Sequence, residues 1–170
     1  APDVIQENPR FSGIYFCAPP ADEDVGRVKG ALDGGFLGIK FHPSADRFRV
    51  DEPPIHKFME LAVERNVPVQ FHTAADAYAH PKMVLKLALK FPRAKIHMVH
   101  MGMHISWGRH GHEDAIRVAK QAENLYLGMS WAEFAWVERA ITQLGVERVL
   151  FESDAPIGIT PEDDRRHDYR

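Results

Sequence analysis

Three short apolar runs of this sequence end near residues that could bind a metal or carry a proton. The first run closes on His72, the second closes on His100, and the third is followed closely by Asp154. Imidazole and carboxylate groups are common ligands of divalent metals, and both transfer protons near neutral pH. Because the carboxyl ends of parallel strands open on one face, we expect these three side chains to converge on one site.

The apolar runs alternate with segments that have helical spacing, which predicts a chain of parallel βα units. Strands are predicted at residues 13–18, 36–42, 67–72, 96–100, 125–130 and 148–151. Helices are predicted at residues 22–33, 54–66, 81–91, 113–123 and from a Ser130/Glu133 capping box through Leu144. Six units in 170 residues are too few for a closed eight-stranded barrel, which typically takes about 250 residues. We therefore expect an α/β fold of the (β/α)8 TIM-barrel type that is incomplete in this chain.

Strand alternation sorts the candidate residues onto two faces. Counting back by two from each strand end gives a mostly polar face with Gly38, Lys40, His42, Gln70, His72, Met98, His100, Glu152 and Asp154. The opposite face holds Ile39, Phe41, Val69, Phe71, Val149 and Phe151. A polar inner face and an apolar outer face are typical of a barrel, whereas a doubly wound sheet buries two apolar faces. On this count His97 faces the helices and is interpreted as structural.

Each polar candidate also has a structural interpretation. A histidine at a strand end can hydrogen-bond to a neighbouring loop, and Asp154 can serve in a turn before Pro156. Lys40 on an inner face needs a partner, for which Glu152 is the first candidate; alternatively, it binds a substrate carboxylate. Residues 101–112 form a long loop with several histidines that either lines a pocket or is solvated.

Composition narrows the class of protein. We expect one domain over residues 1–170, with an N-terminal loop at 1–12 and a polar tail at 161–170. A net charge of -3 gives no reason to expect binding to nucleic acid, and no apolar run is long enough to span a membrane. The single cysteine, Cys17, excludes a disulfide framework and favours a cytoplasmic location. The expected partner is a small-molecule substrate.

The order and spacing of these motifs resemble the amidohydrolase-related family, a branch of the amidohydrolase superfamily, from about residue 10 to about residue 160. The resemblance rests on Gly38–Pro43, Pro68–Thr73, Lys95–Gly102, Asn124–Leu127 and Arg148–Asp154. It implies a TIM barrel that carries out metal-dependent hydrolysis or decarboxylation. It implies that His72 and Asp154 bind the metal and that His100 and Asp154 are catalytic. Lys40 and His42 match a Lys-x-His pair whose role varies in the family.

Two departures from the family pattern stand out. The His-x-His pair of the first barrel strand is absent, as is the closing strand, so the chain is expected to hold strands two to seven. Glu152 replaces a residue that is usually glycine, and it is interpreted as an added ligand, a partner of Lys40 or a block.

The first functional hypothesis is a hydrolase in which a divalent metal, zinc before manganese, activates water to attack an amide, ester or lactone. A non-oxidative decarboxylase on the same scaffold is the alternative. The rival from another class is a non-catalytic, incomplete barrel without bound metal, in which the two open sheet edges favour a homo-oligomer.

Overall fold

The computed structural model describes residues 7–8, 10–19, 24–103, 111–155 and 157. Within them, six strands form one parallel sheet whose spatial order is also the chain order. The strands are β1 (Tyr15–Phe16), β2 (Ile39–Phe41), β3 (Pro68–Ala74), β4 (Lys95–Met103), β5 (Leu125–Gly128) and β6 (Val149–Leu150). Strands that pair in chain order without a reversal form a barrel wall, whereas a doubly wound sheet reverses its order.

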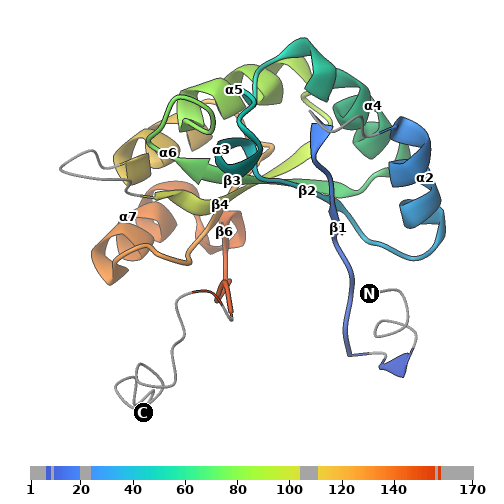
Figure 1. Ribbon diagram of the computed structural model, residues 1–170. Coiled ribbons are helices and arrows are strands. Elements are labelled where there is room, and N and C mark those ends of the chain that lie inside the picture. The colour runs from blue at the N-terminus through green and yellow to red at the C-terminus, as the bar shows by residue number, and fades with distance from the viewer. Residues whose placement is uncertain (1–6, 9, 20–23, 104–110, 156, 158–170) are drawn as a thin grey trace.

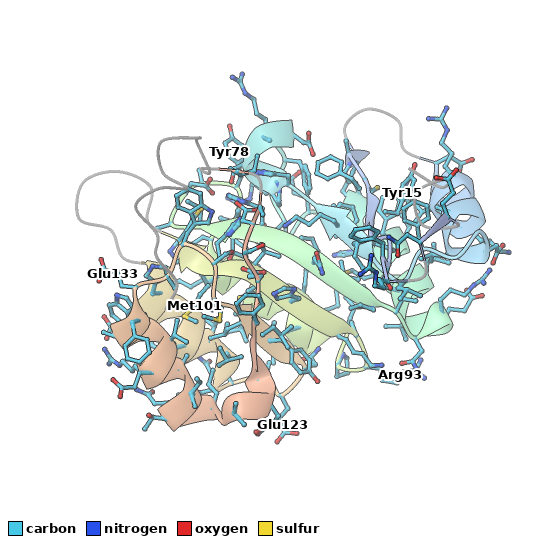
Figure 2. All side chains as sticks on the ribbon, turned by 90° about the horizontal axis from the view of Figure 1, so that it is seen from below. Tyr15, Tyr78, Arg93, Met101, Glu123 and Glu133 are labelled. Carbon is cyan, nitrogen blue, oxygen red and sulfur yellow. The ribbon has the colours of Figure 1, made fainter. Side chains whose placement is uncertain are left out.

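Helices follow the strands and cover one face of the sheet. They are α2 (Val25–Asp33), α3 (Pro43–Asp46), α4 (His56–Arg65), α5 (Pro81–Lys90), α6 (Gly111–Ala119) and α7 (Phe134–Leu144), with 3-10 turns η2 (Pro53–Ile55) and η3 (Val146–Arg148). In Figure 1, α2, α4, α5, α6 and α7 form an arc over the sheet. Seen from below in Figure 2, β3 and β4 face the viewer with no helix across them. One face of the sheet is thus packed and the other is open.

Most helix ends follow from local sequence, but the predicted capping box is wrong. Pro81 stands at the start of α5, and Asn66 ends α4 in the left-handed conformation with φ 54°. The residue that caps α7 is Glu133, and no side chain bonds to the first turn of that helix. Ser130 instead lies at the end of β5, where its hydroxyl contacts other side chains.

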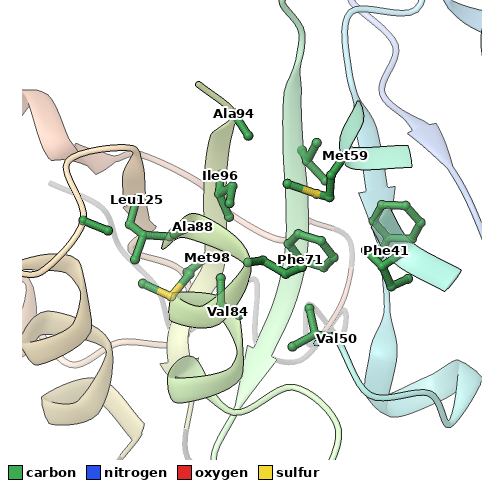
Figure 3. Packing of buried hydrophobic residues seen from close by; sticks show 14 of the residues in the cluster. Phe41, Val50, Met59, Phe71, Val84, Ala88, Ala94, Ile96, Met98 and Leu125 are labelled. Carbon is green, nitrogen blue, oxygen red and sulfur yellow. The ribbon is translucent and has the colours of Figure 1, made fainter. Parts of the chain in front are cut away.

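The core lies between the sheet and the helices. Figure 3 shows Phe41 and Phe71 from neighbouring strands beside Met59 of α4, with Val84 of α5 packed near them. The rings of Phe41 and Phe71 are stacked with centroids 5.2 Å apart, and both side chains are fully buried. Burying a large apolar side chain stabilises a fold by roughly 1.5–3 kcal/mol, so this layer fixes how β2 and β3 stand against α4.

The predicted alternation is confirmed for β2 and β3 and is wrong for Met98. Met98 is fully buried in the core on the helix side, because its register partner on β3 is Phe71. His97 pairs with Gln70 and therefore faces the open side. Phe151 is also misplaced by the prediction: it is 83% exposed and does not pack against the helices.

The β4 strand bends before its end, which explains why the alternation counted back from His100 put Met98 and His97 on the wrong faces. His100, Met101 and Gly102 have φ values of 68°, 48° and 69°, and the β3–β4 register shifts between His72 and Ala74. Side chains alternate only while the backbone stays extended, so the left-handed residues end the alternation. As a result His97 and His100, three positions apart, both reach the open side.

The predicted tail at 161–170 and part of the N-terminal loop lie outside the described residues. Among the described residues, no helix combines the length and apolar character needed to cross a membrane.

Candidate active site

The polar side chains gather on the open face of the sheet, around a cavity of about 380 Å³. Figure 2 looks onto this face, with Tyr78 beyond the carboxyl end of β3 and Arg93 just before the start of β4. The cavity is lined by Ile14, Phe16, Lys40, Gln70, His97, Val99, Ser130, Phe151, Glu152 and Asp154. The structure thus brings Lys40, Glu152 and Asp154 together, as the sequence predicts, and adds His97 and Ser130.

Three histidines stand in a row at the ends of β2, β3 and β4. The rings of His42 and His72 are stacked with centroids 3.8 Å apart, and His100 meets His72 edge-on at 4.9 Å. Burial lowers the pKa of His72 to about 3, and positive charge on His42, His100 and Lys40 adds to the effect. His72 is therefore a neutral imidazole at neutral pH, which is the form that binds metals.

His42 has a structural task that limits its role in chemistry. Its Nδ1 accepts a hydrogen bond of 3.1 Å from the backbone N–H of Ala45, which caps the short helix α3. Burial, and then the nearby Lys40, lowers the pKa of His42 as well. His42 thus stands beside His72 as a neutral ring fixed by its cap.

Glu152 is the centre of a buried hydrogen-bond network. Its Oε1 accepts from the backbone N–H of His100 at 2.7 Å and from the hydroxyl of Ser130 at 2.5 Å. His97 Nε2 lies 3.2 Å from Oε2, although it is not aligned for a hydrogen bond. Burial alone would raise the pKa of Glu152, but its contacts with His97, Ser130 and the His100 amide outweigh burial and lower the pKa to about 2.

This network corrects one prediction and qualifies another. His97 does not face the helices, because it lines the cavity and lies beside a carboxylate. Lys40 and Glu152 are electrostatic neighbours without a salt bridge between them. The sequence left three interpretations of Glu152 open: an added ligand, a partner of Lys40 or a block. In the structure its carboxylate accepts hydrogen bonds from the His100 amide and the Ser130 hydroxyl.

Lys40 is a cation with little access to water. Burial lowers its pKa to about 8, against the attraction of Glu152 and Asp154, which raises it. A lysine of this kind is still charged at neutral pH, and its ammonium lines the cavity. It is available to bind an anionic group of a small molecule.

Asp154 lies across from His100. Its Oδ2 accepts a 2.7 Å hydrogen bond from the indole N–H of Trp131 and is 4.0 Å from His100 Nε2. His100, Trp131 and Asp154 all have positive φ, at 68°, 60° and 57°. Such backbone is uncommon outside glycine and costs free energy, and it clusters at functional sites.

A metal ion fits this site by donor type but not by donor number. His72 and Asp154 are suitable ligands, and His100 Nε2 faces Asp154. Among the residues that the structure describes, however, no three His, Cys, Asp or Glu side chains are arranged to hold an ion. The described part of the chain therefore does not make a complete metal site on its own.

The sequence did not reveal Ser130 as part of the site. Ser130 was assigned to a helix cap, and only its position at the end of a strand beside other site residues could have identified it. In the loop, residues 104–110 lie outside the described residues. His112 is buried and its Nδ1 contacts the Met101 carbonyl at 2.9 Å, so it supports β4 from α6.

A parallel sheet wound in chain order, with ionisable residues at the carboxyl ends of its strands, defines a barrel-type enzyme fold. The amidohydrolase family model matches residues 3–169, and the chain belongs to the amidohydrolase family. Among curated proteins, no significant match is found.

Solved structures show the same fold at low sequence identity. An uncharacterised TIM-barrel protein from Bordetella bronchiseptica aligns with a TM-score of 0.73 and 19% identity, over 91% of this chain and 58% of that protein. The 5-carboxyvanillate decarboxylase LigW from Sphingomonas paucimobilis aligns with a TM-score of 0.64 and 17% identity, over 95% and 65%. A probable 2-pyrone-4,6-dicarboxylic acid hydrolase from Acinetobacter baumannii aligns with a TM-score of 0.64 and 15% identity, over 97% of this chain and 67% of that protein.

These likenesses confirm the predicted fold, part of a TIM barrel. The chain spans less than two thirds of the length of the first two of these structures. The family and its structural relatives include both hydrolases and decarboxylases.

Proposed function

We propose that this chain carries the proton-transfer and substrate-binding part of an amidohydrolase-type active site. The reaction proposed first is metal-assisted hydrolysis of an amide, ester or lactone in a small substrate that bears a carboxylate. The observation that carries the proposal is that Lys40 and Asp154 line one cavity on the open face, while His100 Nε2 lies 4.0 Å from Asp154 Oδ2. These groups supply an anion-binding cation and two proton acceptors within reach of the same small molecule.

Each residue has a distinct task in this proposal. Lys40, charged and partly buried, binds the substrate carboxylate, because an anion compensates the cost of desolvating the ammonium. Asp154 accepts the proton of the attacking water, the proton passes to Nε2 of His100, and His100 delivers it to the leaving group. Water adds across the scissile bond, and the proton lost by water ends on the departing nitrogen or oxygen.

We propose His72 and Asp154 as two ligands of a divalent metal, with zinc considered before manganese. When bound, such a metal lowers the pKa of water and polarises the carbonyl under attack. Support comes from the neutral imidazole of His72 and from a structurally similar 5-carboxyvanillate decarboxylase from Novosphingobium aromaticivorans, which was solved with manganese. Further ligands are needed beyond the described residues to complete the site.

Non-oxidative decarboxylation is the second candidate. A partly buried cation in the electrostatic range of a histidine suits this reaction, because Lys40 can hold the carboxylate while His100, after taking up a proton at Nε2, passes it to the carbon that loses the carboxylate. In that case a carbon–carbon bond breaks and carbon dioxide leaves. The similar LigW and a similar 2,6-dihydroxybenzoate decarboxylase carry this activity in their names.

A pair of probes separates the two reactions. The chain is incubated with zinc or manganese and either 2-pyrone-4,6-dicarboxylic acid or 2,6-dihydroxybenzoate. Hydrolysis incorporates oxygen-18 from labelled water without release of carbon dioxide, whereas decarboxylation releases carbon dioxide. Asp154→Asn should lower the rate of hydrolysis by at least about 100-fold, since general acid–base catalysis contributes that much.

Glu60→Gln is the matched control, because Glu60 is an exposed carboxylate on the outer helix α4. Loss of activity in Glu60→Gln as well would assign the effect to folding. Absence of turnover with every probe, together with absence of bound metal, would favour the non-catalytic hypothesis.

A further inference from the structure

The side chains behind His100 determine which of its ring nitrogens carries the proton. His100 Nδ1 lies 2.7 Å from Ser130 Oγ, and Ser130 Oγ lies 2.5 Å from Glu152 Oε1. His100 and Ser130 are 4% and 6% exposed, so water does not compete for these contacts. The His100 ring, the Ser130 hydroxyl and the Glu152 carboxylate therefore hydrogen-bond to one another, and the number of protons among them is fixed.

Counting donors assigns these protons. An ionised carboxylate only accepts hydrogen bonds, and a serine has one O–H to donate. A separation of 2.5 Å is that of a charge-assisted O–H···O⁻ bond, so the Ser130 proton points to Glu152. The serine oxygen can then interact with His100 Nδ1 only as an acceptor, which requires a proton on Nδ1.

A proton on Nδ1 leaves Nε2 with a lone pair. A neutral imidazole holds one proton, so the proton that faces Ser130 at Nδ1 is the only one on the ring. Nε2 points toward Asp154 Oδ2 at 4.0 Å, an oxygen that already accepts from Trp131. Two acceptors thus face each other, and a proton donor or a cation that enters between them would contact both.

We propose that Ser130 and Glu152 are positioning residues that hold His100 in its Nδ1-protonated tautomer and so present the Nε2 lone pair to the reacting group. The inference deepens the proposed function, on which the catalytic role of His100 rests. The tautomer itself is a property of the chain that can be read without substrate.

The backbone ties the same carboxylate to the position of the ring. Glu152 Oε1 also accepts from the backbone N–H of His100, whose φ is 68°. One carboxylate oxygen thereby fixes the main chain at the bend of β4 and, through Ser130, the ring of the same residue. A residue that only filled space behind the histidine would not need to accept hydrogen bonds from both the His100 backbone and the Ser130 hydroxyl.

The test is histidine tautomer measurement by nuclear magnetic resonance. The chain is labelled with nitrogen-15 on its histidine rings and studied by long-range proton–nitrogen correlation at about pH 7.5, where His100 is neutral. EDTA is present, because a metal on Nε2 would select the same tautomer. The signals of His100 are assigned by their loss in His100→Gln.

The expected result for the wild-type chain is a protonated Nδ1 and an unprotonated Nε2 on His100. Ser130→Ala removes the acceptor and should move most of the population to the Nε2-protonated form, whereas Ser130→Thr keeps the hydroxyl and the original tautomer. Glu152→Gln, a substitution of nearly equal shape, should also shift the population, because an amide can donate to Ser130 and free the hydroxyl to donate to Nδ1.

An Nε2-protonated His100 in the wild-type chain would overturn the inference, as would an unchanged tautomer in both Ser130→Ala and Glu152→Gln. Should Ser130→Ala fail to fold, Glu152→Gln decides alone. A chain with the expected tautomers but without turnover would contradict the proposed function and leave this inference standing.

Discussion

The carboxylate of Glu152 occupies the space where a side chain of Gly128 would stand. A Cβ on Gly128 would overlap both carboxylate oxygens of Glu152, so the end of β5 must be glycine for the network to form. Only in this position can Glu152 reach Ser130 and the amide of His100. The two residues are therefore a matched pair, although 24 positions separate them in the sequence.

The match predicts strong coupling between substitutions at the two positions. Gly128→Ala should destabilise the wild-type chain, because the carboxylate is displaced and its buried partners lose their hydrogen bonds. In a Glu152→Gly background the three atoms nearest to the new Cβ are gone, so the same substitution should cost much less. Urea unfolding of the four chains should give a coupling free energy of about 1–3 kcal/mol, and additive effects would contradict the account.

A second prediction concerns the bend of β4. Buried Thr73 donates a 2.7 Å hydrogen bond to the Val99 carbonyl and accepts one of 2.8 Å from the Gly102 N–H. Thr73→Val keeps the shape but leaves both backbone groups unsatisfied, which should lower the free energy of unfolding by about 1–3 kcal/mol. Thr73→Ser retains the hydroxyl and should lose less than Thr73→Val in the same urea titration. Equal losses in the two variants would show that the hydroxyl does not hold the bend.

The third prediction is a pH dependence of stability that comes from Lys40. Its pKa is about 8 in the folded chain and near the ordinary value of 10.5 in the unfolded chain. Between these values the unfolded state binds more protons, so this residue makes the folded chain more stable as the pH rises from 8 to 10.5.

Lys40→Met removes this contribution and leaves the other titrating groups in place. The free energy of unfolding of the wild-type chain minus that of Lys40→Met should therefore increase across this interval, as measured by urea unfolding at several pH values. A difference that stays level or falls would show that Lys40 is solvated and has an ordinary pKa.

The fourth prediction is self-association through the outer strands, which we propose as the partner interaction of this chain. Within the described residues, β1 and β6 each pair on one side only, and Phe16 and Phe151 near them are 52% and 83% exposed. Open strand edges with apolar neighbours favour pairing with another chain. Light scattering after size exclusion should show a mass that rises with concentration.

Phe151→Glu should reduce this association. Phe134→Glu is the control, because Phe134 is 79% exposed at the start of the helix α7 and does not lie on an edge strand. Association that is equally strong in Phe151→Glu, or a monomer at every concentration, would contradict the proposal.

Hydrophobic periodicity was sufficient to predict the strand and helix order, because burial of one helix stripe and one strand face leaves a local signal. Phe41, Phe71 and the apolar stripe of α4 follow it closely. The face of His97 did not follow: its register with Gln70 sets it, and a count back from His100 fails because of left-handed backbone at His100 that no periodicity reveals.

The candidate site was predictable only where a residue ends a strand. His72, His100 and Asp154 were proposed in this way, and their roles stay predictions. Ser130 was not, because its local spacing to Glu133 imitates a helix cap while its actual partners lie 22 and 30 residues away. The role of Glu152 depends on the space above Gly128, which only the folded sheet creates.

The central claim is that His72 and Asp154 belong to one metal-dependent site, and metal content tests it most directly. The purified chain, His72→Ala, Asp154→Asn and the outer-surface control His56→Ala are loaded with zinc or manganese, dialysed and analysed by elemental mass spectrometry. The account predicts about one metal per chain in the wild type and in His56→Ala, and a clear loss in the other two. Metal bound equally by all four chains, or by none of them, would contradict it.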